Sequence, residues 1–139
     1  MKSYATAPTP GTSAPGEVEA WGLTQAALRM TAAQETADKQ AMIGAVRLNW
    51  RLWTIFQAEL LDPDSTVAMD IRTNLLSLAQ YIDKHTVDFL AKPTPDKIDT
   101  LVNINRELAT GLYQRPTEEK PSEKTQDSSD QAGSVKISV

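Results

Sequence analysis

Apolar residues in the middle of the chain recur every three or four positions, which is the spacing of an α-helix with one buried face. Residues that break helices divide this pattern, because proline cannot continue a helix. Pro15 precedes the pattern, Asp62-Pro63-Asp64 interrupts it, and Pro93 and Pro95 interrupt it again. The pattern therefore predicts four helices, over about residues 16–36, 38–61, 64–91 and 96–111, with the third beginning near Asp64 or Ser65.

The segments between these helices are short, so we expect consecutive helices to pack as antiparallel neighbours. Asp38 is suited to cap the start of the second helix, and Gly111 is a natural stop for the fourth. The predicted fold class is all-α, a small antiparallel bundle of four helices formed by residues 16–112. Residues 1–15 predict a flexible N-terminal arm, and residues 113–139 a disordered charged tail.

The second predicted helix is apolar around most of its circumference. On a helical wheel with about 100° per residue, its polar side chains form one narrow stripe. A bundle of four short helices has little room to enclose such a helix, so part of the apolar arc is expected to face a partner protein. Ile43, Trp50 and Leu61 lie at the edge of the arc and are candidate contact residues. The alternative is that the first helix covers them.

The other predicted helices differ in how their apolar residues are arranged. The third and fourth each have one apolar face, as is usual for helices that pack on a core. The first has two apolar stripes on opposite sides and is weakened further by Gly22. We therefore expect the first helix to be the least firmly held, and to move when a partner binds.

Two asparagines interrupt otherwise apolar arcs, Asn49 in the second helix and Asn105 in the fourth. A buried amide is unfavourable unless it forms hydrogen bonds. The simplest interpretation is that each fixes the register of its helix or bonds a neighbouring backbone group. Direct contact with a binding partner is the alternative.

Composition narrows the possible functions. The chain of 139 residues has no cysteine, which excludes disulfides and thiolate chemistry and suits a reducing cytoplasm. The net charge is −4, and no basic stripe is present, which argues against nucleic acid as the main partner. No apolar run is long enough to span a membrane.

Two features that suggest chemistry have simpler explanations. Asp62-Pro63-Asp64-Ser65-Thr66 matches the pattern of phosphotransferases with an aspartyl nucleophile, but it follows a helix, and a helix-breaking turn explains the same residues. His85 is the only histidine, so it has no second histidine for a metal site, and a packing role is expected. We expect neither an enzyme nor a cofactor or metal site.

Three stretches and a start motif together carry a family resemblance. They are Asn49-Trp50-Arg51-Leu52-Trp53, the segment 75–82, the segment 101–106 closing on Gly111-Leu112, and a Pro15-x-Glu17-x-Glu19-Ala20 start. In this order they resemble the FlaF family of flagellar biosynthesis regulators. Within these stretches Asn49, Trp53 and Asn105 match the shared pattern and join the candidate contact residues.

The resemblance implies a cytoplasmic protein that binds flagellin, promotes its production and export, and acts alongside FlbT, a regulator of flagellin translation. Flagellin's terminal segments are amphipathic helices, which an apolar helical surface can hold. Our leading hypothesis is a flagellin-binding secretion chaperone and regulator. The alternative is an adaptor that regulates flagellin mRNA translation together with FlbT. Neither hypothesis requires direct contact with nucleic acid or with a membrane.

Overall fold

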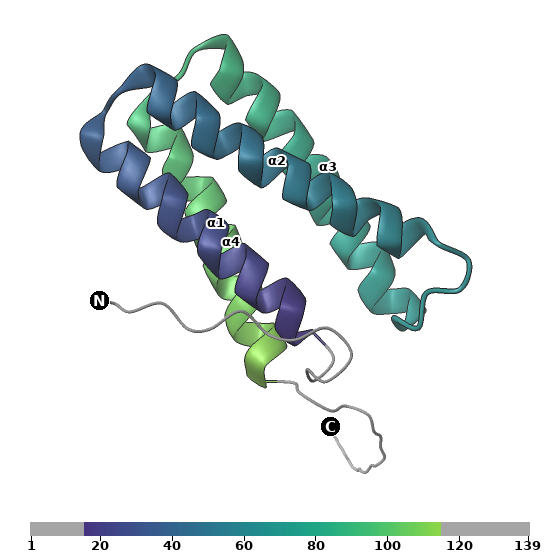
Figure 1. Ribbon diagram of the computed structural model, residues 1–139. Helices are drawn as coiled ribbons and strands as arrows, with labels where there is room; N and C mark the ends of the chain where they lie inside the picture. Colours follow the sequence, from purple (N-terminus) through teal and green to yellow (C-terminus); the bar gives the residue numbers. More distant parts are fainter. Residues whose placement is uncertain (1–15, 115–139) are drawn as a thin grey trace, which may run out of the picture.

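The computed structural model describes residues 16–114. Figure 1 shows four helices that form one bundle, with the chain reversing direction at each connection. They are α1 (Glu17–Thr36), α2 (Lys39–Leu61), α3 (Met69–Ala91) and α4 (Pro95–Gln114). The described residues contain no strand, so the predicted all-α fold with four helices is confirmed. The predicted arm, and the predicted tail beyond residue 114, lie outside the described residues.

Local sequence explains most of the helix boundaries. The Asp38 side chain accepts a hydrogen bond of 2.8 Å from the backbone N–H of Ala41, which satisfies a free donor at the start of α2 as predicted. Ala37, just before it, adopts a left-handed conformation with φ of 56°, and this allows the tight turn from α1 into α2. Pro95 is the first residue of α4, a position that needs no N–H donor.

Two predicted boundaries are wrong. The third helix begins at Met69 and not at Asp64 or Ser65, because the turn forms its own hydrogen bonds. Asp62 accepts bonds from the backbone N–H groups of Asp64 and Ser65, each 2.9 Å long. The fourth helix continues past Gly111 to Gln114; Gly111 does not have the positive φ of a helix stop.

The helices do not all pack on one another equally. The α1–α4 pair packs most extensively, α1–α2 and α2–α3 follow, and α3 has little contact with α4. The core lies in the middle of the bundle, where its largest fully buried apolar side chains are Trp53, Phe89, Leu23, Met30, Ile82, Ile98 and Leu101. At the end that holds the α2–α3 turn, the α2–α3 pair diverges from α1 and α4 (Figure 1).

The first helix packs more extensively than its sequence pattern suggested, while its movement on partner binding stays a prediction. Among the residues whose side chains the structure describes, α1 buries six, more than any other helix, namely Ala20, Leu23, Ala26, Ala27, Met30 and Ala33. The helix packs against two neighbours, α4 and α2. Four of the six are alanines, whose small side chains allow close approach of neighbouring helices.

No helix of the described residues is both long enough and apolar enough to cross a membrane.

Candidate protein-interaction surface

A buried polar network joins three helices at the centre of the bundle. Asn105 on α4 accepts a hydrogen bond of 3.0 Å from Trp53 Nε1 on α2. Its amide nitrogen donates to Asn49 Oδ1 at 2.7 Å and to the carbonyl of Leu23 on α1 at 3.2 Å. Asn49 and Asn105 are both fully buried. The network therefore fixes the register of α4 against α1 and α2, in agreement with the simpler interpretation of these asparagines.

The six candidate contact residues fall into two groups. Asn49, Trp53 and Asn105 are buried in this network and core, so they could meet a partner only if the bundle opened. Ile43 and Trp50 are partly exposed, and Leu61 is 65% exposed. Leu61 is therefore the most accessible of the six, and contact of any of them with a partner stays a prediction.

Trp50 forms a hydrogen bond to α3, which neither of the two alternatives from the sequence included. Its indole N–H donates a hydrogen bond of 2.8 Å to Asp83 Oδ1 on α3, while the alternative had been that the first helix covers it. Sequence spacing gave no sign of this bond, because Asp83 lies 33 positions away. The bond ties the middle of α2 to α3 and leaves the indole ring partly exposed.

The apolar stripe of α3 loses its cover toward the start of the helix. Ile71, Leu75, Leu78, Ile82 and Phe89 share one face by their spacing. Ile82 and Phe89 are fully buried, and Leu78 is partly buried against the core, while Ile71 and Leu75 are partly exposed. The cover is lost because α4 has little contact with α3.

The same end of the α2–α3 hairpin holds further exposed apolar side chains. Leu61 and Met69 flank the turn with exposed fractions of 65% and 67%. Phe56 on α2 is partly exposed at the margin of the core. We call Phe56, Leu61, Met69, Ile71 and Leu75 the distal surface. Exposed apolar side chains gathered in one region are typical of protein contact sites.

An acidic pair stands beside the distal surface. Glu59 on α2 is largely exposed, but slight burial raises the pKa of its carboxyl above the usual value of 4.5, and the negative charge of Glu19 on α1 raises it further. Of these two causes, burial is the larger. Sequence reasoning missed this pair, because two residues 40 positions apart are brought together only by the tertiary fold.

We predict a small effect of this pair on stability. The raised pKa of Glu59 means that the folded state binds its proton more tightly than the unfolded chain, so this contribution is full below pH 4.5 and is lost as pH rises through the folded pKa. Glu59→Gln should therefore stabilise the protein at neutral pH by no more than about 0.5 kcal/mol, because the side chain is exposed.

Urea unfolding at neutral pH and below pH 4.5 would test this prediction. The gain from Glu59→Gln should disappear at the lower pH. The control is Glu35→Gln, which removes one acidic charge from an exposed position at the other end of α1. An equal gain from both variants would show that the effect is one of net charge only.

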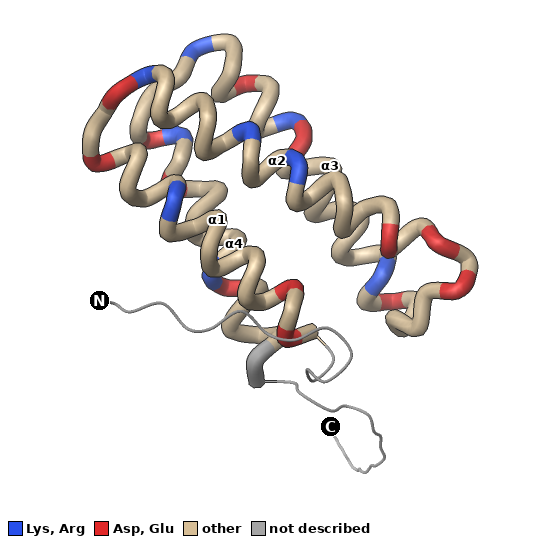
Figure 2. Tube along the Cα trace, viewed as in Figure 1, with Lys and Arg blue, Asp and Glu red and all other residues tan. Residues whose placement is uncertain are grey.

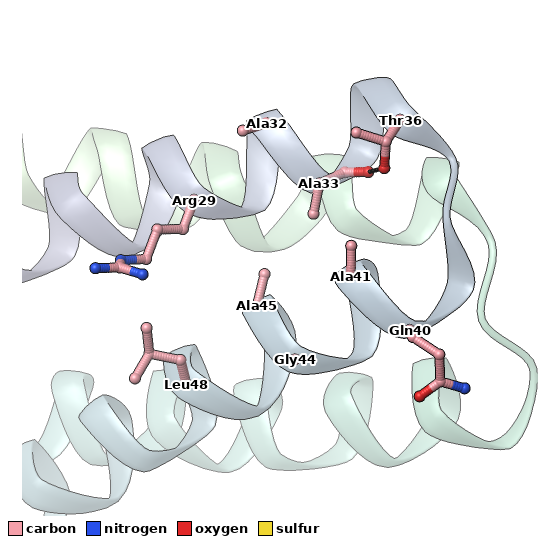
Figure 3. A pocket seen from close by; sticks show the side chains of 9 residues that line it. All are labelled: Arg29, Ala32, Ala33, Thr36, Gln40, Ala41, Gly44, Ala45 and Leu48. Atoms are coloured by element: carbon pink, nitrogen blue, oxygen red, sulfur yellow. Dashed lines mark hydrogen bonds between the residues drawn. The ribbon is translucent and has the colours of Figure 1, made fainter.

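A groove lies between α1 and α2, at the end of α2 that is remote from the distal surface (Figure 3). It is an open groove with a volume of about 470 Å³, and it is lined by Arg29, Ala32, Ala33, Thr36, Gln40, Ala41, Gly44, Ala45 and Leu48. Most of these side chains are small, and a Cβ added at Gly44 would meet no atom within 4 Å. The groove is thus shallow, and no charged group other than Arg29 lines it.

The features that suggested chemistry have structural roles here. His85 Nε2 lies 2.7 Å from the carbonyl oxygen of Lys97, and its ring stacks on Tyr81, so it helps to pack α3 against α4 as expected. Asp62 organises the turn after α2. Within residues 16–114 no group of three or more His, Cys, Asp or Glu residues is placed to hold a metal ion.

Arg72 closes the C-terminal end of α2. Its guanidinium donates to the carbonyl oxygens of Leu60 at 3.5 Å and Asp62 at 3.3 Å. The Leu60 carbonyl lies in the last turn of α2, and the Asp62 carbonyl also accepts the backbone N–H of Ser65, so the arginine joins the end of the helix to the turn that follows it.

Comparison with known families gives one match. The model of the family described as flagellar protein FlaF matches residues 1–112, which include almost all of the four helices. No curated protein and no solved structure matches the chain. The family match agrees with the resemblance carried by the three stretches and the start motif, and it covers most of the sequence. The chain therefore belongs to the FlaF family of flagellar proteins.

Proposed function

We propose that this protein binds flagellin in the cytoplasm and promotes its production and export during flagellum assembly. The observation that carries the proposal is the distal surface, an apolar region that the bundle leaves partly uncovered in a member of a flagellar family. Amphipathic helices of an unassembled subunit need an apolar surface to shield them, and helix-in-groove recognition supplies one.

The proposal has a physical basis in the free energy of burial. Burying an exposed leucine or methionine side chain contributes about 1.5–3 kcal/mol. Leu61 and Met69 are about two-thirds exposed in the free protein. A partner that covers both side chains would therefore gain most of this free energy of burial from each of them. The acidic charge of the chain would help to keep such a complex soluble.

We predict that Leu61→Ser/Met69→Ser binds purified flagellin at least about tenfold more weakly than the wild type, because two apolar contacts are lost. Isothermal titration calorimetry with monomeric flagellin measures the effect. The variant should fold normally, since both side chains are exposed, and far-UV circular dichroism checks this.

The matched control is Val87→Ser, which removes an apolar side chain that is 56% exposed on α3, away from the distal surface. It should bind flagellin with unchanged affinity. The proposal fails if the folded wild-type protein does not bind flagellin at all.

A second candidate is an adaptor that regulates flagellin mRNA translation together with FlbT. The groove between α1 and α2 favours it, because this groove is separated from the distal surface along α2 and would leave room for a second protein. FlbT should then co-purify with the protein from a strain that lacks flagellin. Loss of FlbT from that preparation would exclude the adaptor.

A further inference from the structure

The charges around the distal surface are nearly all negative. Figure 2 shows acidic positions gathered at the α2–α3 turn and at the start of α1, which lie at the same end of the bundle. The acidic residues in question are Glu19 on α1, Glu59 on α2, and Asp62, Asp64 and Asp70 at the turn and the start of α3. The one basic side chain among them, Arg72, donates to backbone carbonyls of the turn.

This arrangement has an electrostatic consequence. Glu59 and the aspartates of the turn flank the exposed Leu61 and Met69, and the negative charge of Glu19 on α1 also acts on Glu59, where it raises the carboxyl pKa. Carboxylates gathered at one end of the molecule repel one another, and cationic side chains brought among them would relieve this repulsion. The distal surface thus combines an uncovered apolar stripe with a border that favours positive charge.

We infer that the distal surface binds an amphipathic helix whose apolar stripe is bordered by lysine or arginine. The inference rests on the proposed function, in which this helix is the segment of flagellin that the protein recognises. Its apolar side would contact Phe56, Ile71 and Leu75, and its basic side chains would lie beside Glu59 and the aspartates of the α2–α3 turn.

The dimensions of the surface suit a helix. The part of α3 that lacks buried residues runs from Met69 to Leu78. This length corresponds to about 15 Å along the axis, which is enough for about three turns of a packed helix. A helix at this place would cover the stripe that α4 leaves open.

The same charges disfavour other occupants. A second copy of this chain would bring a second acidic border against the first, and the repulsion would oppose association. Nucleic acid and anionic lipid surfaces carry the same sign of charge as the border. A basic amphipathic helix is the occupant that satisfies both the apolar stripe and its border.

The test uses the full chain and two fluorescent helical peptides with the same leucine stripe, bordered by lysine in one and by glutamate in the other. Fluorescence anisotropy measures both dissociation constants. We expect the lysine peptide to bind at least about tenfold more tightly at low ionic strength, and this preference to shrink in high salt.

Three variants locate the charged and the apolar contacts on the molecule. Glu59→Lys should reduce the preference to within about threefold, since one charge of the border is reversed. Glu35→Lys, which reverses one charge at the other end of α1, should leave it unchanged. Leu75→Ser should weaken the binding of both peptides equally, and circular dichroism distinguishes this result from loss of the fold.

Several results would overturn the inference. They are equal affinity for the two peptides, equal effects of Glu59→Lys and Glu35→Lys, or a dimer in analytical ultracentrifugation that Leu75→Ser dissociates. Flagellin is measured in parallel with the same variants. If neither Glu59→Lys nor Leu75→Ser changes the affinity for flagellin, the inference is overturned and the proposed function stands. The expected peptide results without flagellin binding overturn the proposed function instead.

Discussion

Trp53→Ala is expected to destabilise the bundle by about 3–5 kcal/mol. The Trp53 side chain is 1% exposed and is the largest fully buried side chain of the core. Its ring packs edge-on against Phe56 with 6.0 Å between the ring centroids, and its N–H donates to Asn105. Alanine would remove the packed ring and leave the Asn105 oxygen without this donor. Domains of this size have a total stability of about 5–15 kcal/mol, so much of it would be lost.

Urea unfolding followed by far-UV circular dichroism measures this loss, with two variants for comparison. Trp53→Phe keeps an aromatic ring and removes the N–H donor, so its loss should be smaller, about 1–2 kcal/mol. Ile55→Ala, two residues further along α2, truncates a side chain that is 51% exposed and should cost less than about 1 kcal/mol. If Trp53→Ala costs no more than Ile55→Ala, Trp53 is not the centre of the core.

The helices could be predicted because their limits depend on local chemistry. Asp38 caps the helix that directly follows it, and Pro95 begins α4, whatever the rest of the chain does. The start of α3 was missed because Asp62 offers the turn hydrogen bonds that compete with those of a helix. Helical spacing alone does not show which of these alternatives has the lower free energy.

Contacts between helices were less predictable than the helices themselves. The two apolar stripes of α1 were visible in the sequence, but the neighbours that each stripe meets depend on the arrangement of all four helices. The pairing of Trp50 with Asp83 and the approach of Glu19 to Glu59 have the same origin. The exposure of Leu61 was foreseen, because it lies at the edge of an arc too wide for a small bundle to cover.

For the two buried asparagines, the need for hydrogen bonds could be predicted from the sequence, but their partners could not. Their position inside apolar arcs predicted that they form hydrogen bonds, since an unpaired buried amide is unfavourable. Spacing within each helix could not show that Asn49 and Asn105 bond to each other across 56 positions, or that Leu23 contributes its carbonyl. The network therefore became visible only once α1, α2 and α4 were placed together.

Asn105→Ala is expected to cost about 3–4 kcal/mol, because it leaves three buried polar groups without the bonds that Asn105 supplies. These are the indole N–H of Trp53, the carbonyl of Leu23 and the side-chain oxygen of Asn49. Asn49→Ala should cost less, about 1–2 kcal/mol, because Asn105 would still bond Trp53 and Leu23. The amide nitrogen of Asn49 has no hydrogen-bond partner among the described residues, so its removal costs no bond there.

The order of these two losses tests whether Asn105 is the hub of the network. Urea unfolding of both single variants and of Asn49→Ala/Asn105→Ala gives a double-mutant cycle. The double variant should cost less than the sum of the single variants, because their shared hydrogen bond of 2.7 Å can be lost only once. If the two losses are equal and additive, the asparagines act independently and the register of α4 depends on its apolar packing alone.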